Sequence, residues 1–167
     1  MTAIIFPGQG SQYVGMSRDF YENSKIAKST LEEIEDYVEM NIKELIFNDD
    51  SNLLNTTKYT QISIFAASLL IFKTLENETD LIDSSINIMM GHSLGEYTAL
   101  ACSKKLSLRD CSIILKKRGS LMHDAVETNK SGMVAVIGKD NNFIQDIIKK
   151  NNLKLQIAND NSPIQVV

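Results

Sequence analysis

A serine flanked by two glycines is the residue in this sequence best suited to covalent chemistry. The motif Gly91-His92-Ser93-Leu94-Gly95 fits G-x-S-x-G, and it follows a short apolar run and precedes a helical pattern. A sharp strand-to-helix turn would place the serine hydroxyl at a helix N-terminus, where backbone N–H groups stabilise a developing oxyanion. We therefore predict that Ser93 is a nucleophile and that the N–H of Leu94 is an oxyanion donor. The alternative is an ordinary glycine-rich turn with a capping serine.

A second glycine-rich loop, residues 8–12, follows the apolar run at residues 2–6. It lacks the Gly-Lys-Ser/Thr of a phosphate-binding loop, and Tyr13 stands where a dinucleotide-binding loop needs glycine. A loop at the carboxyl end of a parallel strand belongs at the ligand-binding edge of the sheet. If the two strands are neighbours, this loop faces Ser93, and the N–H of Gln9 is a candidate for the second oxyanion donor.

Four motifs, in this order and spacing, resemble those of the malonyl-CoA:acyl carrier protein transacylases. They are Phe-Pro-Gly-Gln-Gly-Ser-Gln at 6–12, Gly-His-Ser-Leu-Gly-Glu-Tyr at 91–97, Lys-Arg-Gly at 117–119 and Asn-Asp-Asn-Ser-Pro at 159–163. The whole chain is similar to the N-terminal part of that family. The resemblance implies an acyltransferase of fatty-acid synthesis that moves malonyl from coenzyme A to the phosphopantetheine thiol of acyl carrier protein. Malonyl-CoA is then a substrate, and no cofactor is permanently bound.

The resemblance also assigns roles to the residues of the turn and the first loop. Ser93 would carry the malonyl group as an ester. The backbone N–H groups of Gln9 and Leu94 would form the oxyanion hole. These are the donors that the G-x-S-x-G pattern and the position of the loop suggest independently.

Three further residues are assigned to the substrate. Arg118 would hold the free carboxylate of malonyl, and Gln61 and Asn161 would line the pocket. Lysine is the usual cation of this chain, since only Arg18, Arg109 and Arg118 among its 17 basic residues are arginine. A guanidinium grips a carboxylate with a planar fork that lysine lacks, which favours Arg118 as the anchor. The alternative is a surface arginine paired with an acid.

The sequence departs only mildly from the family pattern. Ile62 follows Gln61 where relatives often carry proline, and Asp160 interrupts the asparagine run. Neither departure falls on the nucleophile, its oxyanion donors or the arginine.

A base that could deprotonate the serine is harder to find. His92 should point away from Ser93 at the strand end and hydrogen-bond beneath the turn. His123 fits a partly exposed surface position. A serine hydroxyl is a poor nucleophile without a base. In the resembled family the base is a histidine from the second half of the protein, so we expect these 167 residues alone to show little turnover.

The surrounding pattern predicts an α/β fold. Apolar runs at 2–6 and 86–90 indicate strands, the first of them buried on both faces as in a parallel sheet. Apolar spacing, with a capping-box pattern at Ser107 and Asp110, predicts helices from residue 27, over 61–75, over about 96–103 and from 107 to about 125. The last quarter predicts strands at 133–137 and 153–158, a helix capped by Asp140, and a turn at 159–163 before a final apolar run.

The resemblance refines this expectation to a hydrolase-like parallel-sheet core, residues 1–127, and the start of a small ferredoxin-like α+β subdomain, residues 128–167. Two core strands are too few for a parallel sheet, and the chain stops inside an apolar run. We therefore expect the sequence to be the first part of a longer protein, one that is monomeric at full length.

Composition narrows the function classes. The net charge of −4, without a long basic stripe, argues against a nucleic-acid binder. The N-terminus lacks a signal-peptide pattern, and no apolar stretch is long enough to span a membrane. Two cysteines without a Cys/His cluster indicate no metal site and a reducing compartment, so we expect a cytoplasmic protein.

Two other functions remain open. A serine hydrolase, such as an esterase or a patatin-like lipase, would use the same turn but does not explain Arg118 or the loop at 8–12. A truncated fragment without turnover, or a scaffold for carrier proteins, would also be compatible with the pattern.

Overall fold

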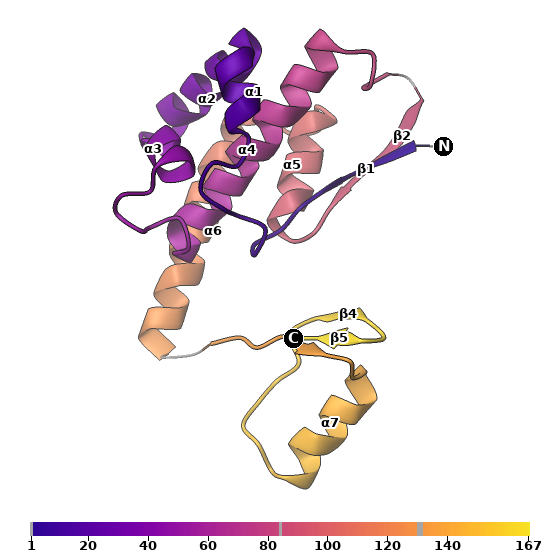
Figure 1. Cartoon of the computed structure of the whole chain (residues 1–167). Helices are drawn as coiled ribbons and strands as arrows, with labels where there is room; N and C mark the ends of the chain where they lie inside the picture. Colours follow the sequence, from indigo (N-terminus) through magenta and orange to yellow (C-terminus); the bar gives the residue numbers. More distant parts are fainter. Residues whose placement is uncertain (1, 84, 130–131) are drawn as a thin grey trace. The chain divides into compact units, whose positions relative to one another are not determined.

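The computed structural model describes residues 2–83, 85–129 and 132–167 (Figure 1). The chain divides into two compact units, residues 1–125 and residues 126–167, which are described separately below. Helices and a parallel sheet make up the first unit, so the predicted α/β class is confirmed. In the described part of the chain, no helix is both long and apolar enough to cross a lipid bilayer.

The first unit contains two strands and most of the helices. In chain order its elements are β1 (Thr2–Phe6), α1 (Arg18–Asn23), α2 (Lys25–Val38), α3 (Ile42–Phe47), α4 (Thr57–Glu78), β2 (Ile86–Gly91), α5 (Leu94–Cys102) and α6 (Leu108–Asn129), whose last residues belong to the second unit. The two predicted strands are confirmed. Helices α1 and α3 were not predicted, because six residues are too few to display a helical period.

The sheet of this unit positions both glycine-rich loops. Strands β1 and β2 pair in parallel, with Phe6 opposite Gly91 at their carboxyl ends. The chain therefore leaves both strands at the same edge of the sheet, as the sequence predicted for neighbouring strands. The prediction that β1 is buried on both faces is wrong: Phe6 is buried, but Ile5 is 69% exposed. An apolar run alone does not show how many neighbours its strand has.

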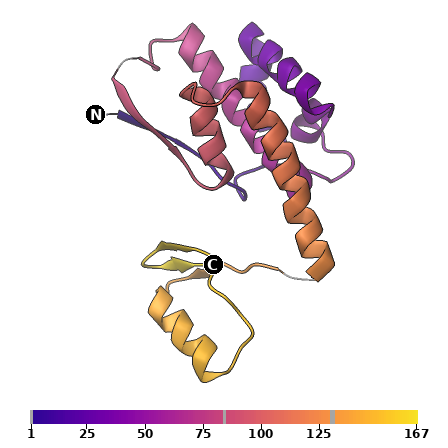
Figure 2. The same ribbon diagram turned by 180° about the vertical axis from the view of Figure 1, so that it is seen from behind.

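Helix α4 forms the centre of the core. All of residues 60–70 are buried, which is the pattern of a helix covered on every side (Figure 1). Helix α2 packs on it through the predicted stripe of Ala27, Leu31, Ile34 and Val38, and α5 also packs against it. Viewed from behind, α6 runs over the same layer (Figure 2).

The start of α6 follows the predicted capping box. Its first turn is closed by two hydrogen bonds, from Asp110 N to Ser107 Oγ at 3.0 Å and from Ser107 Oγ to Asp110 Oδ2 at 2.7 Å. This reciprocal cap fixes the residue at which α6 begins. The start of the helix in turn determines which of its residues, about ten positions further along, lie near the serine turn.

The second unit is a small α+β arrangement of β3 (Val136–Ile137), α7 (Asn141–Lys150), β4 (Asp160–Ser162) and β5 (Gln165–Val166). Its antiparallel sheet has the order β3-β5-β4. The predicted cap of α7 is confirmed, since Phe143 N donates to Asp140 Oδ1 at 2.8 Å.

Two predictions for the last quarter are wrong. Residues 153–158 form no strand, although their apolar positions alternate, because they join no ladder and are mostly exposed. The expected turn at 159–163 contains β4 instead, and the reversal comes at residues 163–164, just before β5.

Candidate active site

Ser93 lies in a strained turn between β2 and α5. Its φ of 55° and ψ of −110° fall in a region that a residue with a side chain rarely adopts. A Cβ added to Gly91 would lie 2.0 Å from the carbonyl carbon of Gly95, and one added to Gly95 would lie 2.4 Å from the Phe6 oxygen. The two glycines are therefore required by close packing, and the exposed Ser93 side chain stands at the top of the turn. This is the predicted geometry of a serine elbow.

His92 packs against the first loop. A Cβ added to Gly8 would lie 2.5 Å from His92 Nδ1, so the ring covers this glycine. The backbone N–H of His92 donates to the Phe6 oxygen at 3.1 Å, which extends the β1–β2 pairing into the turn. The predicted hydrogen bond of the His92 ring beneath the turn is not among the contacts of the described residues. Instead, the ring brings the loop at 8–12 close to the turn.

Arg118 reaches the serine from α6. Its Nη2 donates to Ser93 Oγ at 2.8 Å, and its Nη1 donates to Gln61 Oε1. Among the described residues, Arg118 is the only side chain that hydrogen-bonds Ser93 Oγ, so neither His92 nor His123 contacts the hydroxyl. The hydroxyl that we predict to be the nucleophile and a guanidinium are thus direct neighbours.

Gln61 connects Arg118 to the first loop. It is fully buried in α4, and its Nε2 donates to Gln9 Oε1 at 2.9 Å. Gln9 Nε2 in turn donates to Thr57 Oγ1 at 3.1 Å, in the first turn of α4. Because a guanidinium can only donate, the oxygen of Gln61 must face Arg118, which fixes the orientation of its amide. The contacts form a one-way chain of donors from Arg118 through Gln61 and Gln9 to Thr57.

Among the described residues, the charge of Arg118 has no acidic partner. No Asp or Glu side chain in the described part of the chain lies within ion-pair distance of it. Its other contact is with an aromatic ring, since its Cζ lies 5.9 Å from the centroid of Tyr97 on α5. A guanidinium has five N–H donors. The two hydrogen bonds above leave others available for an anionic ligand.

The two proposed oxyanion donors lie at the expected places in the chain. Leu94 is the first residue of α5, and Gln9 lies in the loop after β1. Within the described residues, neither backbone N–H donates to another backbone group. Both are available in principle for a ligand oxygen, and their joint role stays a prediction.

Asn161 lies apart from these residues in the chain. It is an exposed residue of β4, in the second unit, and its place in a substrate pocket stays a prediction. The structure adds three residues to the site. Thr57 was not singled out by the sequence, and Tyr97 and Gly119 were quoted only as the last residues of two motifs, without a role. Each would have needed knowledge of which helices meet, since a threonine, a tyrosine and a glycine carry no chemical signal by themselves.

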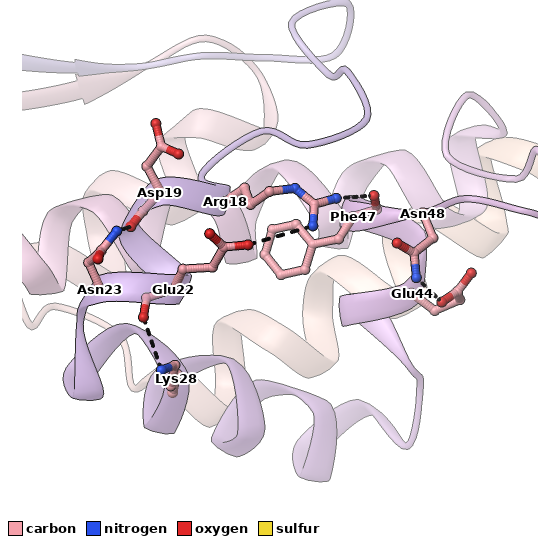
Figure 3. Close-up of polar contacts among 8 residues, drawn as sticks. All are labelled: Arg18, Asp19, Glu22, Asn23, Lys28, Glu44, Phe47 and Asn48. Atoms are coloured by element: carbon pink, nitrogen blue, oxygen red, sulfur yellow. Dashed lines mark hydrogen bonds and ion pairs between the residues drawn. The ribbon is translucent and has the colours of Figure 1, made fainter.

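A second arginine, Arg18, offers a contrast on the same unit (Figure 3). It helps line a surface hollow of about 510 Å³ over α1 and α3. Its Nη2 donates to the Phe47 carbonyl oxygen, its Nη1 lies 3.8 Å from Glu22 Oε1, and its Cζ lies 5.0 Å from the Phe47 ring centroid. Arg18 is therefore matched by an acidic side chain and stacked on a ring.

The cysteines take no part in this site. Cys102 and Cys111 are both buried and unpaired. Burial raises the pKa of the Cys102 thiol and raises that of Cys111 to about 11, so both stay protonated near neutral pH. Among residues 2–83, 85–129 and 132–167, no group of His, Cys, Asp and Glu side chains is arranged to hold a metal ion.

The chain is similar to known proteins in sequence and in fold. Residues 3–167 match the family described as acyl transferase domain. A malonyl CoA-acyl carrier protein transacylase of Staphylococcus aureus (strain COL) is 36% identical over 169 residues, which cover 99% of this chain and 53% of that protein. The crystal structure of MCAT from Streptococcus pneumoniae superimposes with a TM-score of 0.84 at 34% identity, and covers 99% of this chain and 53% of that one.

Another solved structure that matches is a complex. It is described as a type II PKS acyl-carrier protein with its malonyl-transacylase, and it has a TM-score of 0.83 at 30% identity, with 98% of this chain and 53% of that chain covered. The chain thus spans about half the length of the relatives it matches.

Proposed function

This chain belongs to the acyl transferase domain family, and from that premise we propose that it takes part in a malonyl transfer of fatty-acid biosynthesis. In this reaction, the malonyl group moves from coenzyme A to the phosphopantetheine thiol of acyl carrier protein. One observation carries the proposal: the 2.8 Å contact between Ser93 Oγ and an arginine that no acidic side chain neutralises in the described part of the chain. This pair offers a nucleophile and an anion site side by side.

The spacing of this pair fits malonyl in particular. Only one methylene separates the free carboxylate of malonyl from the thioester carbonyl carbon. The group that holds the carboxylate must therefore lie next to the group that attacks the carbonyl. Acetyl has no carboxylate and would leave Arg118 unpaired, whereas a longer dicarboxylic acyl group would need a more distant anchor.

In the proposed reaction, Ser93 Oγ attacks the thioester carbonyl carbon of malonyl-CoA. The backbone N–H groups of Gln9 and Leu94 stabilise the oxyanion, and the carbon–sulfur bond then breaks as coenzyme A leaves as its thiol. The carrier thiol attacks the resulting ester and restores the Ser93 hydroxyl. Throughout, Arg118 holds the carboxylate, so that the acyl group keeps one orientation in both steps.

The proton acceptor for Ser93 is proposed to lie outside this chain. His92 covers Gly8, and no contact joins His123 to the hydroxyl among the described residues. We propose that a histidine from the half of the relatives that this chain does not span supplies the base.

Several broader expectations remain part of the proposal. Residues 1–127 would be the first part of an acyltransferase core, and residues 128–167 the start of a ferredoxin-like subdomain. Gln61 would line the substrate pocket. The protein would act in the cytoplasm as a monomer at full length, with malonyl-CoA as a substrate and not as a resident cofactor.

The test is intact-mass analysis after incubation with malonyl-CoA. We expect the protein to gain the mass of one malonyl group, and Ser93→Ala to gain none. Ser103→Ala, at the other end of α5, is the matched control, because its hydroxyl only donates to the Leu100 carbonyl. An adduct that persists in Ser93→Ala would contradict the assignment of the nucleophile.

A further inference from the structure

Helices α4 and α6 meet in an unusually close contact at Gly119. A Cβ added to this buried glycine would lie 2.8 Å from the Lys58 carbonyl oxygen and 3.1 Å from the Thr57 carbonyl oxygen. Both oxygens are backbone atoms in the first turn of α4, so they cannot swing aside as a flexible side chain would. Glycine inside a helix costs about 1 kcal/mol relative to alanine, which calls for a packing reason. Here the reason is the approach of α6 to the first turn of α4.

The residues on either side of this contact belong to the site. On α6, Arg118 directly precedes Gly119. On α4, Thr57 supplies the carbonyl that meets Gly119, and its hydroxyl accepts the hydrogen bond from Gln9. The separation of the two helices at Gly119 therefore fixes how far Arg118 stands from Gln61.

Together these contacts close a ring. Starting at Arg118, donors lead through Gln61 and Gln9 to the Thr57 hydroxyl. From the Thr57 carbonyl, the backbone contact leads to Gly119 and so back to Arg118. Every link is either a hydrogen bond or a packed backbone contact. The guanidinium is held from both sides, by the polar chain and by the helix crossing.

We propose that Thr57 and Gly119 are positioning residues for acyl selectivity, which hold the Arg118 guanidinium beside Ser93 where it can bind the free carboxylate of the acyl group. The inference rests on the proposed function, in which Arg118 is the carboxylate anchor. Neither residue touches the substrate in this account. Both act through Arg118, so their effect should appear with charged acyl groups and not with uncharged ones.

An alanine at position 119 would push α6 away from α4, because its methyl group cannot fit against the Lys58 carbonyl. Displacements of about 1 Å in a positioned group change rates by up to about 100-fold. A glycine needed only for packing would slow acylation by all acyl groups alike. A glycine that positions Arg118 would slow acylation by malonyl more than acylation by acetyl.

The experiment compares the rates at which malonyl-CoA and acetyl-CoA acylate the protein, followed by intact mass. For Gly119→Ala we expect the ratio of malonyl to acetyl rate to fall about tenfold. Ser120→Ala, the next residue on α6, is the matched control and should keep the ratio, since its hydroxyl donates to the Lys116 carbonyl within α6 itself. Far-UV circular dichroism and thermal melting identify the variants that fold.

A second pair of variants decides the matter should Gly119→Ala fail to fold. Thr57 is partly exposed, so substitutions there disturb the core little. Thr57→Val removes the acceptor of the Gln9 side chain, and we expect the ratio to fall about threefold, the size of one neutral hydrogen bond. Thr57→Ser keeps a hydroxyl and should restore the ratio.

The outcomes separate this inference from the proposed function. A wild-type protein without preference for malonyl would overturn the proposed function, and the inference with it. A wild-type preference that persists unchanged in folded Gly119→Ala and in Thr57→Val would overturn the inference alone. Equal slowing of both acyl groups would likewise overturn it, because it would show a purely structural role.

Discussion

Two arginines on the first unit show how the same side chain can serve different ends. Arg18 is matched by Glu22, donates to a backbone carbonyl and stacks on the Phe47 ring (Figure 3). Arg118 donates to two neutral oxygens, one of them the serine hydroxyl, and meets no acidic side chain in the described part of the chain. The charge of Arg18 is used within the protein. The charge of Arg118 remains available to a ligand.

The supports of the two arginines differ as well. The main acceptor of Arg18 is a backbone carbonyl, which no substitution at residue 47 removes. Arg118 depends on the amide of Gln61, a side chain that is fully buried and itself tied to Gln9. A backbone acceptor suits a structural contact. A side-chain acceptor makes the position of Arg118 sensitive to single substitutions in α4.

Replacing each arginine in turn should separate their roles most strongly. For Arg118→Ala we expect the preference for malonyl over acetyl in acylation of Ser93 to fall about 10- to 100-fold, the size of a hydrogen bond to a charged group. For Arg18→Ala we expect an unchanged preference for malonyl. We also expect a lower melting temperature, because the contact with the Phe47 ring and the hydrogen bond to the Phe47 carbonyl are lost. Rates from intact mass and thermal melts of both variants measure the two effects. Equal loss of preference in both would remove the contrast.

Loosening the support of Arg118 should have a smaller effect. Gln61→Leu keeps the volume of the buried side chain but removes the acceptor of Arg118 and the donor to Gln9. We expect the malonyl preference to fall about 3- to 10-fold, in line with the loss of one or two hydrogen bonds. Competition between malonyl-CoA and acetyl-CoA would measure it. Gln145→Leu on α7 serves as a control that should leave the preference intact, because the Gln145 amide donates to Asn141, a residue outside the site.

The smallest expected effect is a loss of stability at alkaline pH, caused by the buried thiols. The arginine variants should therefore be compared below the pH at which this loss begins. The pKa of Cys111 is raised by burial to about 11, so in alkaline solution the unfolded chain loses this proton before the folded one does. The contribution of this protonated thiol to the free energy of unfolding should therefore be fully present below about pH 8.5, and about 1 kcal/mol of it should be lost by pH 10. Urea unfolding at several pH values measures this slope. Cys111→Ala should remove the part of the slope that Cys111 contributes, whereas the part from Cys102, whose pKa is also raised by burial, should remain. A stability that rises with pH over this range would contradict the assignment.

The serine turn is the part of the site that sequence predicts best. The two glycines of the motif are required by the close packing within the turn itself. The local sequence is therefore enough to predict the geometry of the turn. The pairing of β1 with β2 was only a condition of the prediction for the first loop, and the structure supplies it. Arg118 and Gln61 were assigned from the resemblance, and Gln9 from the position of its loop as well. The structure adds the hydrogen bonds that join the three side chains.

The features that the sequence analysis did not predict depend on contacts between helices and strands that are distant in the sequence. Thr57 lies in a polar stretch of the sequence, and Gly119 was quoted only as the last residue of a motif. Their role is indicated only by the contact between α4 and α6. The alternation at 153–158 suggested a strand, but a strand needs a continuous ladder to a neighbour, and among the described residues this segment is part of no ladder. The short helices α1 and α3 escaped notice because one and a half turns show no period.

The most direct test of the central claim is a crystal structure of the protein after reaction with malonyl-CoA. The account predicts an ester on Ser93 Oγ, with the free carboxylate of the acyl group held by two N–H donors of Arg118 and with Gln61 still bound to the guanidinium. An ester whose carboxylate faces solvent, with Arg118 turned elsewhere, would contradict it.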